Sequence, residues 1–216
     1  MTNEELWFRQ FIQKDEFSEA LGFVWRFGHI DILNNIFEFS HRSSHVVSRF
    51  SNLIFGATAP RSYFRKDKGF IEWETHIDSS HPFLQEAMKM GWTPRLQQER
   101  SFPRGEFNES IFTKTYILLR HDVGIMREKN KHGILMRPRL RIHGSIDVLQ
   151  NICRILHQDL GIKPKKLQTD LKVERAKTIY YQSKKDIPNI LNYIGATESL
   201  EKFNSFDLGY QEVVTQ

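Results

Sequence analysis

The segment EALGFVWRFGHI, residues 19–30, is an apolar helical run that ends at a glycine, and the segment YILLRHDVGIM, residues 116–126, has the same character. Both runs are apolar around most of their circumference, and helices of that kind are usually buried. We therefore expect helices at residues 17–28 and 112–122 that pack against each other.

The elements that follow these two runs recur in the same order, which indicates an internal repeat. After the first run, the periodicity predicts strands within 29–41, a helix at 43–55, strands at 61–66 and 70–77, and a helix at 81–91. After the second run it predicts two strands that meet near 129–133, a helix at 146–160, strands at 167–173 and 176–182, and a helix at 187–194. A glycine, Gly56 or Gly161, follows each middle helix as a stop signal. The chain is therefore predicted to be an α+β protein with two αββαββα repeats related by pseudo-twofold symmetry.

The repeats divide the sequence into five segments. We expect an amphipathic N-terminal helix at 1–16, a first repeat at 17–92, a linker at 93–111, a second repeat at 112–203 and a C-terminal tail at 204–216. The linker assignment rests on Pro94, Pro103 and Gly105 and on the absence of a sustained hydrophobic period.

The charge of the chain is unevenly distributed. The net charge is +5, but residues 1–108 carry 13 Lys and Arg against 14 Asp and Glu, whereas residues 109–216 carry 18 against 12. Excess positive charge favours a polyanionic partner, although it also serves solubility. No stretch approaches the roughly 20 apolar residues of a membrane-spanning helix, so we expect a soluble intracellular protein without a membrane partner. A single cysteine, Cys153, excludes an intramolecular disulfide and a CxxC zinc site.

The segment RPRLRIH, residues 137–143, carries the clearest binding signal. If it is a strand, Arg137, Arg139, Arg141 and His143 line one side, and the residues between them line the other. Alternate residues of a strand lie about 6.8 Å apart. Phosphates along a nucleic-acid strand have a similar spacing, and arginine can also grip a guanine edge. The segment itself contains no acid, so we favour a nucleic-acid contact over an ordinary solvated face.

Other basic residues extend the predicted nucleic-acid surface. They lie near the later strands of both repeats and are Arg61, Arg65, Lys66, Lys163, Lys165, Lys166 and Lys172. Glu72 and Glu74 share one face of a neighbouring strand. We expect that face to point away from nucleic acid, because carboxylates repel phosphate. The alternative is that these acids accept from cytosine amino groups.

The two glycine-ended runs resemble the motif helices of LAGLIDADG homing endonucleases. The second half resembles the family over a longer stretch, through residues 116–126, 137–145 and 149–161, which follow its order of motif helix, β-hairpin and middle helix. This resemblance implies that small residues let the two motif helices approach closely. It also implies that each helix delivers one carboxylate, at its carboxyl end, to a shared site where Mg²⁺ ions activate water against a phosphodiester.

The acids of this motif are missing or displaced. In the first run Phe27 stands directly before Gly28, where the resemblance implies an acid, and phenylalanine cannot bind a hard cation. The nearest carboxylate, Asp31, lies three residues beyond that glycine.

In the second run Val123 precedes Gly124, and Asp122 stands one position earlier. With the register shifted by one residue, Asp122 becomes the one candidate catalytic and metal-binding residue. The alternative is an aspartate that faces solvent or an arginine. Arg26, Arg120 and His121 add positive charge here, which opposes metal binding and favours phosphate.

We therefore expect a nucleic-acid-binding protein of the LAGLIDADG type that is not an efficient nuclease. Its partner would be duplex DNA or structured RNA, it would be a monomer with internal pseudo-dimer symmetry, and it would use Mg²⁺ only if it is catalytic. Three alternatives stay open. One is an active site-specific DNA endonuclease with atypical acids, and another is an RNA-binding derivative such as an intron maturase or a structural ribonucleoprotein component. The third is an unrelated α+β enzyme or interaction module whose repeat is coincidental.

Overall fold

The computed structural model describes residues 2–94, 100–131, 133–169 and 177–211. The chain divides into two compact units, Met1–Tyr116 and Ile117–Gln216, which we call unit 1 and unit 2. The segment 93–111, predicted as the linker, lies within unit 1. In the described residues, no helix is both long and apolar enough to cross a membrane.

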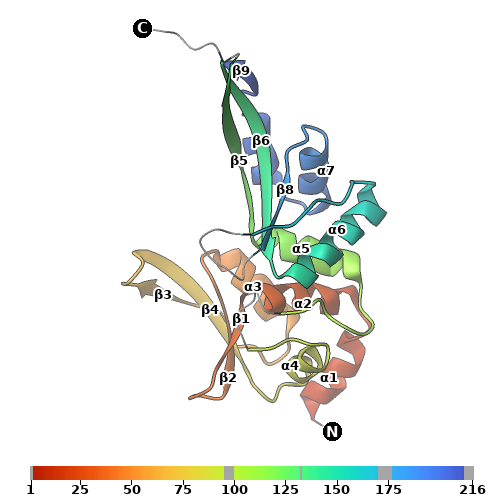
Figure 1. Ribbon diagram of the computed structural model, residues 1–216. Helices are drawn as coiled ribbons and strands as arrows, with labels where there is room; N and C mark the ends of the chain where they lie inside the picture. Colours follow the sequence, from red (N-terminus) through yellow and green to blue (C-terminus); the bar gives the residue numbers. More distant parts are fainter. Residues whose placement is uncertain (1, 95–99, 132, 170–176, 212–216) are drawn as a thin grey trace. The chain divides into compact units, whose positions relative to one another are not determined.

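Unit 1 contains one antiparallel sheet, sheet A, with strand order β1-β2-β4-β3 (Figure 1). Helices α1 (Asn3–Phe11) and α2 (Asp15–Phe27) precede the sheet. Its strands are β1 (Gly28–Asp31), β2 (Ile36–His41), β3 (Arg61–Arg65) and β4 (Phe70–Asp78). Helix α3 (Ser44–Leu53) joins β2 to β3, α4 (Pro82–Lys89) follows β4, and α5 (Glu109–Leu119) begins in this unit.

The core of unit 1 lies between sheet A and helices α2 and α3. Phe37 and Phe39 on β2 and Ile77 on β4 are almost fully buried on this side of the sheet. The ring of Phe50 on α3 packs against Phe39, with 4.6 Å between the ring centroids. The opposite side, which carries the alternate residues of the strands, is the outer face of sheet A.

Helix α2 packs closely on the first turns of α5. A Cβ atom added at Gly22 would lie 2.7 Å from the Cβ of Thr115 and 3.1 Å from the carbonyl oxygen of Phe112. The ring centroids of Trp25 and Phe112 are 5.9 Å apart. The predicted contact between the two apolar runs is therefore confirmed, and Gly22 is the small residue that permits it.

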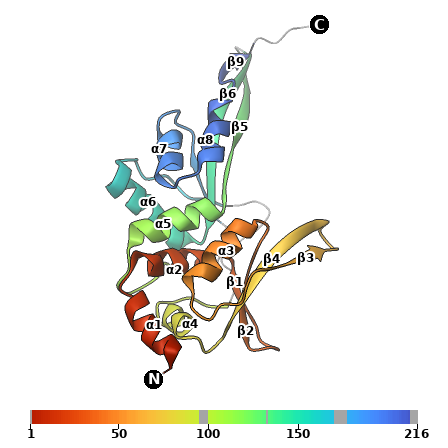
Figure 2. The same ribbon diagram turned by 180° about the vertical axis from the view of Figure 1, so that it is seen from behind.

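Unit 2 contains a second antiparallel sheet, sheet B, with strand order β5-β6-β8-β7 and β9 paired to β6. The strands are β5 (His121–Asn130), β6 (Gly133–Gly144), β7 (Gln168–Thr169), β8 (Lys177–Tyr181) and β9 (Gly209–Gln211). Strands β5 and β6 form a long hairpin (Figure 1). The helices are α6 (Ile146–Leu160), α7 (Asp186–Tyr193) and α8 (Thr197–Asn204), and α8 runs beside β5 (Figure 2).

Helix α6 supplies much of the core of unit 2. The hydroxyl of Ser145 caps its first turn by accepting from the backbone N–H of Val148, and Gly161 ends it with φ 67°. Its apolar side chains Leu149, Ile152 and Leu156 are fully buried. Since α6 contacts β6 and β8, these side chains cover the inner face of sheet B, and the opposite side is its outer face.

The predicted order αββαββα is confirmed in both halves of the chain. The second motif helix is shorter than predicted, because α5 ends at Leu119 and residues from His121 onward pair with β6. Asp122 therefore lies on a strand and not at the end of the predicted helix 112–122. Helix α8 and strand β9, within 197–211, were not predicted as separate elements.

Candidate nucleic-acid interface

The arginines of β6 lie where the alternation of a strand predicts. Arg137, Arg139 and Arg141 point to the outer face of sheet B, and their side chains are 46%, 24% and 32% exposed. Pro138, Leu140 and Ile142 between them are buried on the inner face. The three arginines form a row along one strand, which we call the arginine stripe.

Acids from β5 accompany the arginine stripe. Asp122 lies directly opposite Arg141, and its Oδ2 is 2.7 Å from Nε and 2.6 Å from Nη2 of that arginine. Arg139 Nη2 lies 3.6 Å from the same oxygen, and Arg137 Nε lies 3.2 Å from Oε2 of Glu128. The stripe thus has two carboxylates on the adjacent strand, although its own segment contains none. Because exposed ion pairs contribute only about 0–1 kcal/mol, a phosphate can compete for these guanidinium groups.

Two further residues of unit 2 that were predicted to contact nucleic acid contact other protein side chains instead. The ring of His143 is half-buried, and its Nδ1 lies 2.9 Å from Oγ1 of Thr178. Lys165 Nζ lies 3.9 Å from Oδ2 of Asp186 and 5.7 Å from the ring centroid of Tyr181. These contacts stabilise local structure and reduce the availability of both side chains for phosphate.

Of the three remaining predicted lysines of unit 2, the structure describes two. Lys163 and Lys166 are exposed in the segment between α6 and β7. Lys172 lies outside the described residues.

The basic residues of the β3–β4 hairpin share their face with acids. Arg65 contacts Asp67 and Glu72, both at 2.9 Å, and hydrogen bonds to its partners raise the pKa of its guanidinium. Arg61 lies opposite Glu74 in the strand register, and Lys66 is exposed in the turn.

The strand register places Glu72 and Glu74 on the same face of sheet A as Arg61 and Arg65. On its strands, the outer face of sheet A carries five carboxylates and two arginines. They are Asp31, Glu38, Glu72, Glu74 and Asp78 against Arg61 and Arg65. This face is acidic.

A buried arginine occupies the carboxyl end of α2. Arg100 donates hydrogen bonds to the backbone carbonyls of Val24 at 2.9 Å, Trp25 at 2.7 Å and Gly28 at 2.6 Å. The residue is 3% exposed, and burial lowers the pKa of its guanidinium to about 10. Arg100 therefore supplies a donor to the carbonyl of Trp25, which lies in the last turn of α2, where carbonyls lack intrahelical partners.

This end of α2 does not fit a site for Mg²⁺. Mg²⁺ needs oxygen ligands, but the last helical residue is Phe27, and the nearby carbonyls already accept from Arg100. The guanidinium of Arg26, only 2% exposed, adds a second positive charge at this end of the helix. The same two arginines would oppose an incoming cation.

The carboxylate of Asp122 is engaged by Arg141 and Arg139. This arrangement matches the alternative in which Asp122 faces an arginine. Arg100 was missed as a structural residue of the motif, because it lies in a segment without hydrophobic period and contacts α2 across more than 70 positions.

No protein-family model matches the sequence, and no curated protein matches it. Solved structures do resemble the fold. Full-length DUF199/WhiA from Thermatoga maritima matches with 19% identity and a TM-score of 0.51 over 88% of this chain, which spans only 60% of that protein. The N-terminal LAGLIDADG domain of DUF199/WhiA matches with 18% identity and a TM-score of 0.52 over 87% of this chain and 86% of the other.

The homing endonuclease I-WcaI, bound to its DNA recognition sequence, matches with 11% identity and a TM-score of 0.60 over 93% of each chain. The α+β repeat of this chain is thus a LAGLIDADG-type fold. Identities this low show the fold and not the activity, which has to be argued from the residues of this chain.

Proposed function

We propose that this protein binds nucleic acid through the outer face of sheet B and does not cut it efficiently. The arginine stripe carries the proposal, because it places three guanidinium groups in a row on one exposed strand face. Two similar folds support it: I-WcaI is bound to its DNA recognition sequence, and I-SmaMI is bound to an uncleaved DNA target in the presence of calcium ions.

The charges of unit 2 suit a polyanion. Residues 117–216 carry 17 Lys and Arg against 11 Asp and Glu, whereas residues 1–116 carry 14 against 15. On β5 and β6, Asp122 and Glu128 offset part of the stripe. A bound phosphate would replace a carboxylate as the partner of an arginine, and counterions released from the nucleic acid would favour the exchange.

The absence of efficient cleavage follows from the chemistry at α2. In-line attack on a phosphodiester through bound metal ions needs carboxylate ligands, and Phe27 cannot provide one. The guanidinium of Arg100 donates to the neighbouring carbonyls. We therefore propose that this protein recognises nucleic acid and that any hydrolysis is residual.

The salt dependence of binding tests the role of the stripe. A variant with Arg137→Ala, Arg139→Ala and Arg141→Ala should bind duplex DNA or structured RNA more weakly. The slope of log K against log salt should also fall, by about 0.9 for each lost phosphate contact on duplex DNA. Parallel titrations with DNA and RNA of matched length show which of the two is the tighter ligand.

A matched control removes the same charge from the helices of unit 2. Arg154, Lys185 and Lys202 lie on or next to α6, α7 and α8 and are exposed. The triple alanine variant at these positions loses three charges and should keep most of the slope. Equal slopes in both triple variants would show that the stripe is an ordinary solvated face.

A further inference from the structure

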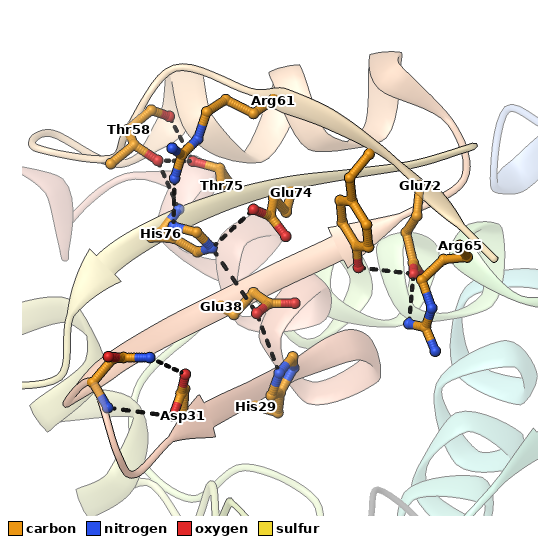
Figure 3. Close-up of polar contacts among 12 residues, drawn as sticks. His29, Asp31, Glu38, Thr58, Arg61, Arg65, Glu72, Glu74, Thr75 and His76 are labelled. Atoms are coloured by element: carbon orange, nitrogen blue, oxygen red, sulfur yellow. Dashed lines mark hydrogen bonds and ion pairs between the residues drawn. The ribbon is translucent and has the colours of Figure 1, made fainter. Parts of the chain in front are cut away.

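Four potential metal ligands lie side by side on the outer face of sheet A (Figure 3). The strand register places Glu38 of β2 opposite His29 of β1 on one side and opposite His76 of β4 on the other. Glu74 is two residues before His76 and therefore lies on the same face. Three neighbouring strands thus contribute two imidazoles and two carboxylates.

The ligand atoms of Glu38, Glu74 and His76 have the spacing of a coordination shell, and His29 lies beside Glu38. Ligand atoms of Glu38, Glu74 and His76 all lie within 4.8 Å of one another. His76 Nε2 is 3.6 Å from Oε1 of Glu74 and 3.9 Å from Oε2 of Glu38, and His29 Nε2 is 3.6 Å from that same Glu38 oxygen. These separations are too long for hydrogen bonds. They lie near the ~3.4 Å between two ligand atoms bound tetrahedrally at about 2.0–2.1 Å from zinc.

We propose that Glu38, Glu74 and His76 bind one divalent transition-metal ion of the zinc type, at a site that His29 borders on the Glu38 side. Imidazole nitrogens favour zinc and its neighbours, whereas Mg²⁺ and Ca²⁺ prefer an all-oxygen shell. The side chains of Glu38, Glu74 and His76 are 19%, 21% and 14% exposed, so they are partly desolvated but still open to an ion. The ion would also offset the excess of carboxylates on this face.

Arg61 favours one tautomer of a neutral His76 ring when no metal is bound. Its Nη2 lies 3.3 Å from Nδ1 of His76. A guanidinium can only donate, so Nδ1 accepts and the neutral ring carries its proton on Nε2, toward Glu38 and Glu74. A metal ion on Nε2 moves that proton to Nδ1, and the exposed Arg61 then has to turn away. Arg61 thus competes with the metal, and a side chain that accepts from Nδ1–H would assist it.

Metal titration of the tag-free, chelator-treated protein tests the site. We expect one equivalent of Zn²⁺ to bind by calorimetry, and Co²⁺ to give the intense visible absorption of a four-coordinate site. Glu38→Gln or His76→Gln should weaken binding by at least about tenfold, since even loss of a residue that only supports a ligand costs 10–100-fold. Zn²⁺ should raise the Tm of the original protein more than that of either variant.

Two further variants separate a metal site from general acidity and from misfolding. Glu72→Gln removes a neighbouring carboxylate that contacts Arg65 and Tyr63, and it should leave the affinity unchanged. Arg61→Gln supplies a carbonyl oxygen for Nδ1–H of His76 and should tighten binding. Absence of saturable binding at one equivalent would overturn the proposal, as would an equal loss of affinity in Glu38→Gln and Glu72→Gln. All of these measurements use the protein without nucleic acid, so they are independent of the proposed function.

Discussion

At the scale of single residues, His81 makes the N-terminal cap of α4 sensitive to pH. It is 2% exposed, its Nδ1 accepts from the backbone N–H of Phe83 at 3.3 Å, and its Nε2 lies 2.9 Å from the carbonyl oxygen of Phe55. Nε2 therefore carries the proton of a neutral ring, and burial lowers the pKa of His81 below 6.5. Protonation at Nδ1 would break the cap of the helix.

The stability contributed by His81 should fall in acid. Because the unfolded chain binds this proton more tightly, the contribution is complete above the unfolded pKa near 6.5 and is lost as pH falls through the lowered folded pKa. We expect a lower urea midpoint at about pH 5.5 than at about pH 7.5. His81→Asn retains a capping side chain without titrating and should reduce the difference. His41 and His121, whose pKa values are also lowered by burial, would supply the remainder. A pH dependence identical in His81→Asn would contradict this role.

Arg100 should contribute more to the free energy of unfolding than an exposed arginine does. Arg100→Ala would leave the buried carbonyls of Trp25 and Gly28 without this donor, and a buried unsatisfied polar group costs about 1–3 kcal/mol. We therefore expect the free energy of unfolding to fall by at least about 2 kcal/mol in urea titrations. Arg104→Ala, at an exposed position nearby, should change it by no more than about 0.5 kcal/mol. Similar losses in the two variants would show that Arg100 does not hold the end of α2.

At the scale of elements, the contact between α2 and α5 depends on Gly22. Gly22→Ala places a Cβ 2.7 Å from that of Thr115, so the helices have to separate, and we expect a loss of about 1–3 kcal/mol by thermal unfolding. Combining it with Thr115→Gly removes the clashing atom and should cost less than the sum of the two single changes. Strict additivity would show that the helices do not meet at this point. Gly124→Ala is the control, because its Cβ would lie 3.7 Å from the nearest side chain.

The elements could be predicted from sequence because their signals are local. The apolar spacing of α6, its Ser145 cap and its Gly161 terminus all lie within 17 residues, and the alternation of β6 lies within seven. The end of α5 was placed three residues too late, because pairing with β6 turns an apolar run into a strand from His121 onward. The sequence of that run alone does not reveal the pairing.

At the scale of the whole molecule, the candidate sites depend on register between distant strands. The arginine stripe was predicted because its residues alternate along one short strand segment. An arginine partner for Asp122 was only one alternative, and neither Glu128 as a partner nor the group formed by Glu38, Glu74 and His76 was predicted, since these contacts join different strands. The sequence therefore identified the arginines of β6, and the structure adds that acids lie beside them and beside Arg65. We therefore expect the proposed binding of nucleic acid to depend strongly on ionic strength, because phosphate has to compete with these acids.

The whole protein should make no double-strand breaks in Mg²⁺. Cutting both strands needs a carboxylate from each motif helix, and α2 ends in Phe27 with Arg100 on its terminal carbonyls. Incubation with a library of duplex targets, followed by gel analysis of linear and nicked products, measures both outcomes. Any residual activity should be slow nicking that requires Mg²⁺ and is abolished by Asp122→Asn, whereas Asp159→Asn on α6 should leave it unchanged. Efficient double-strand cleavage that is insensitive to Asp122→Asn would show that both active-site positions are misplaced, and Asp31 would be the next residue to test.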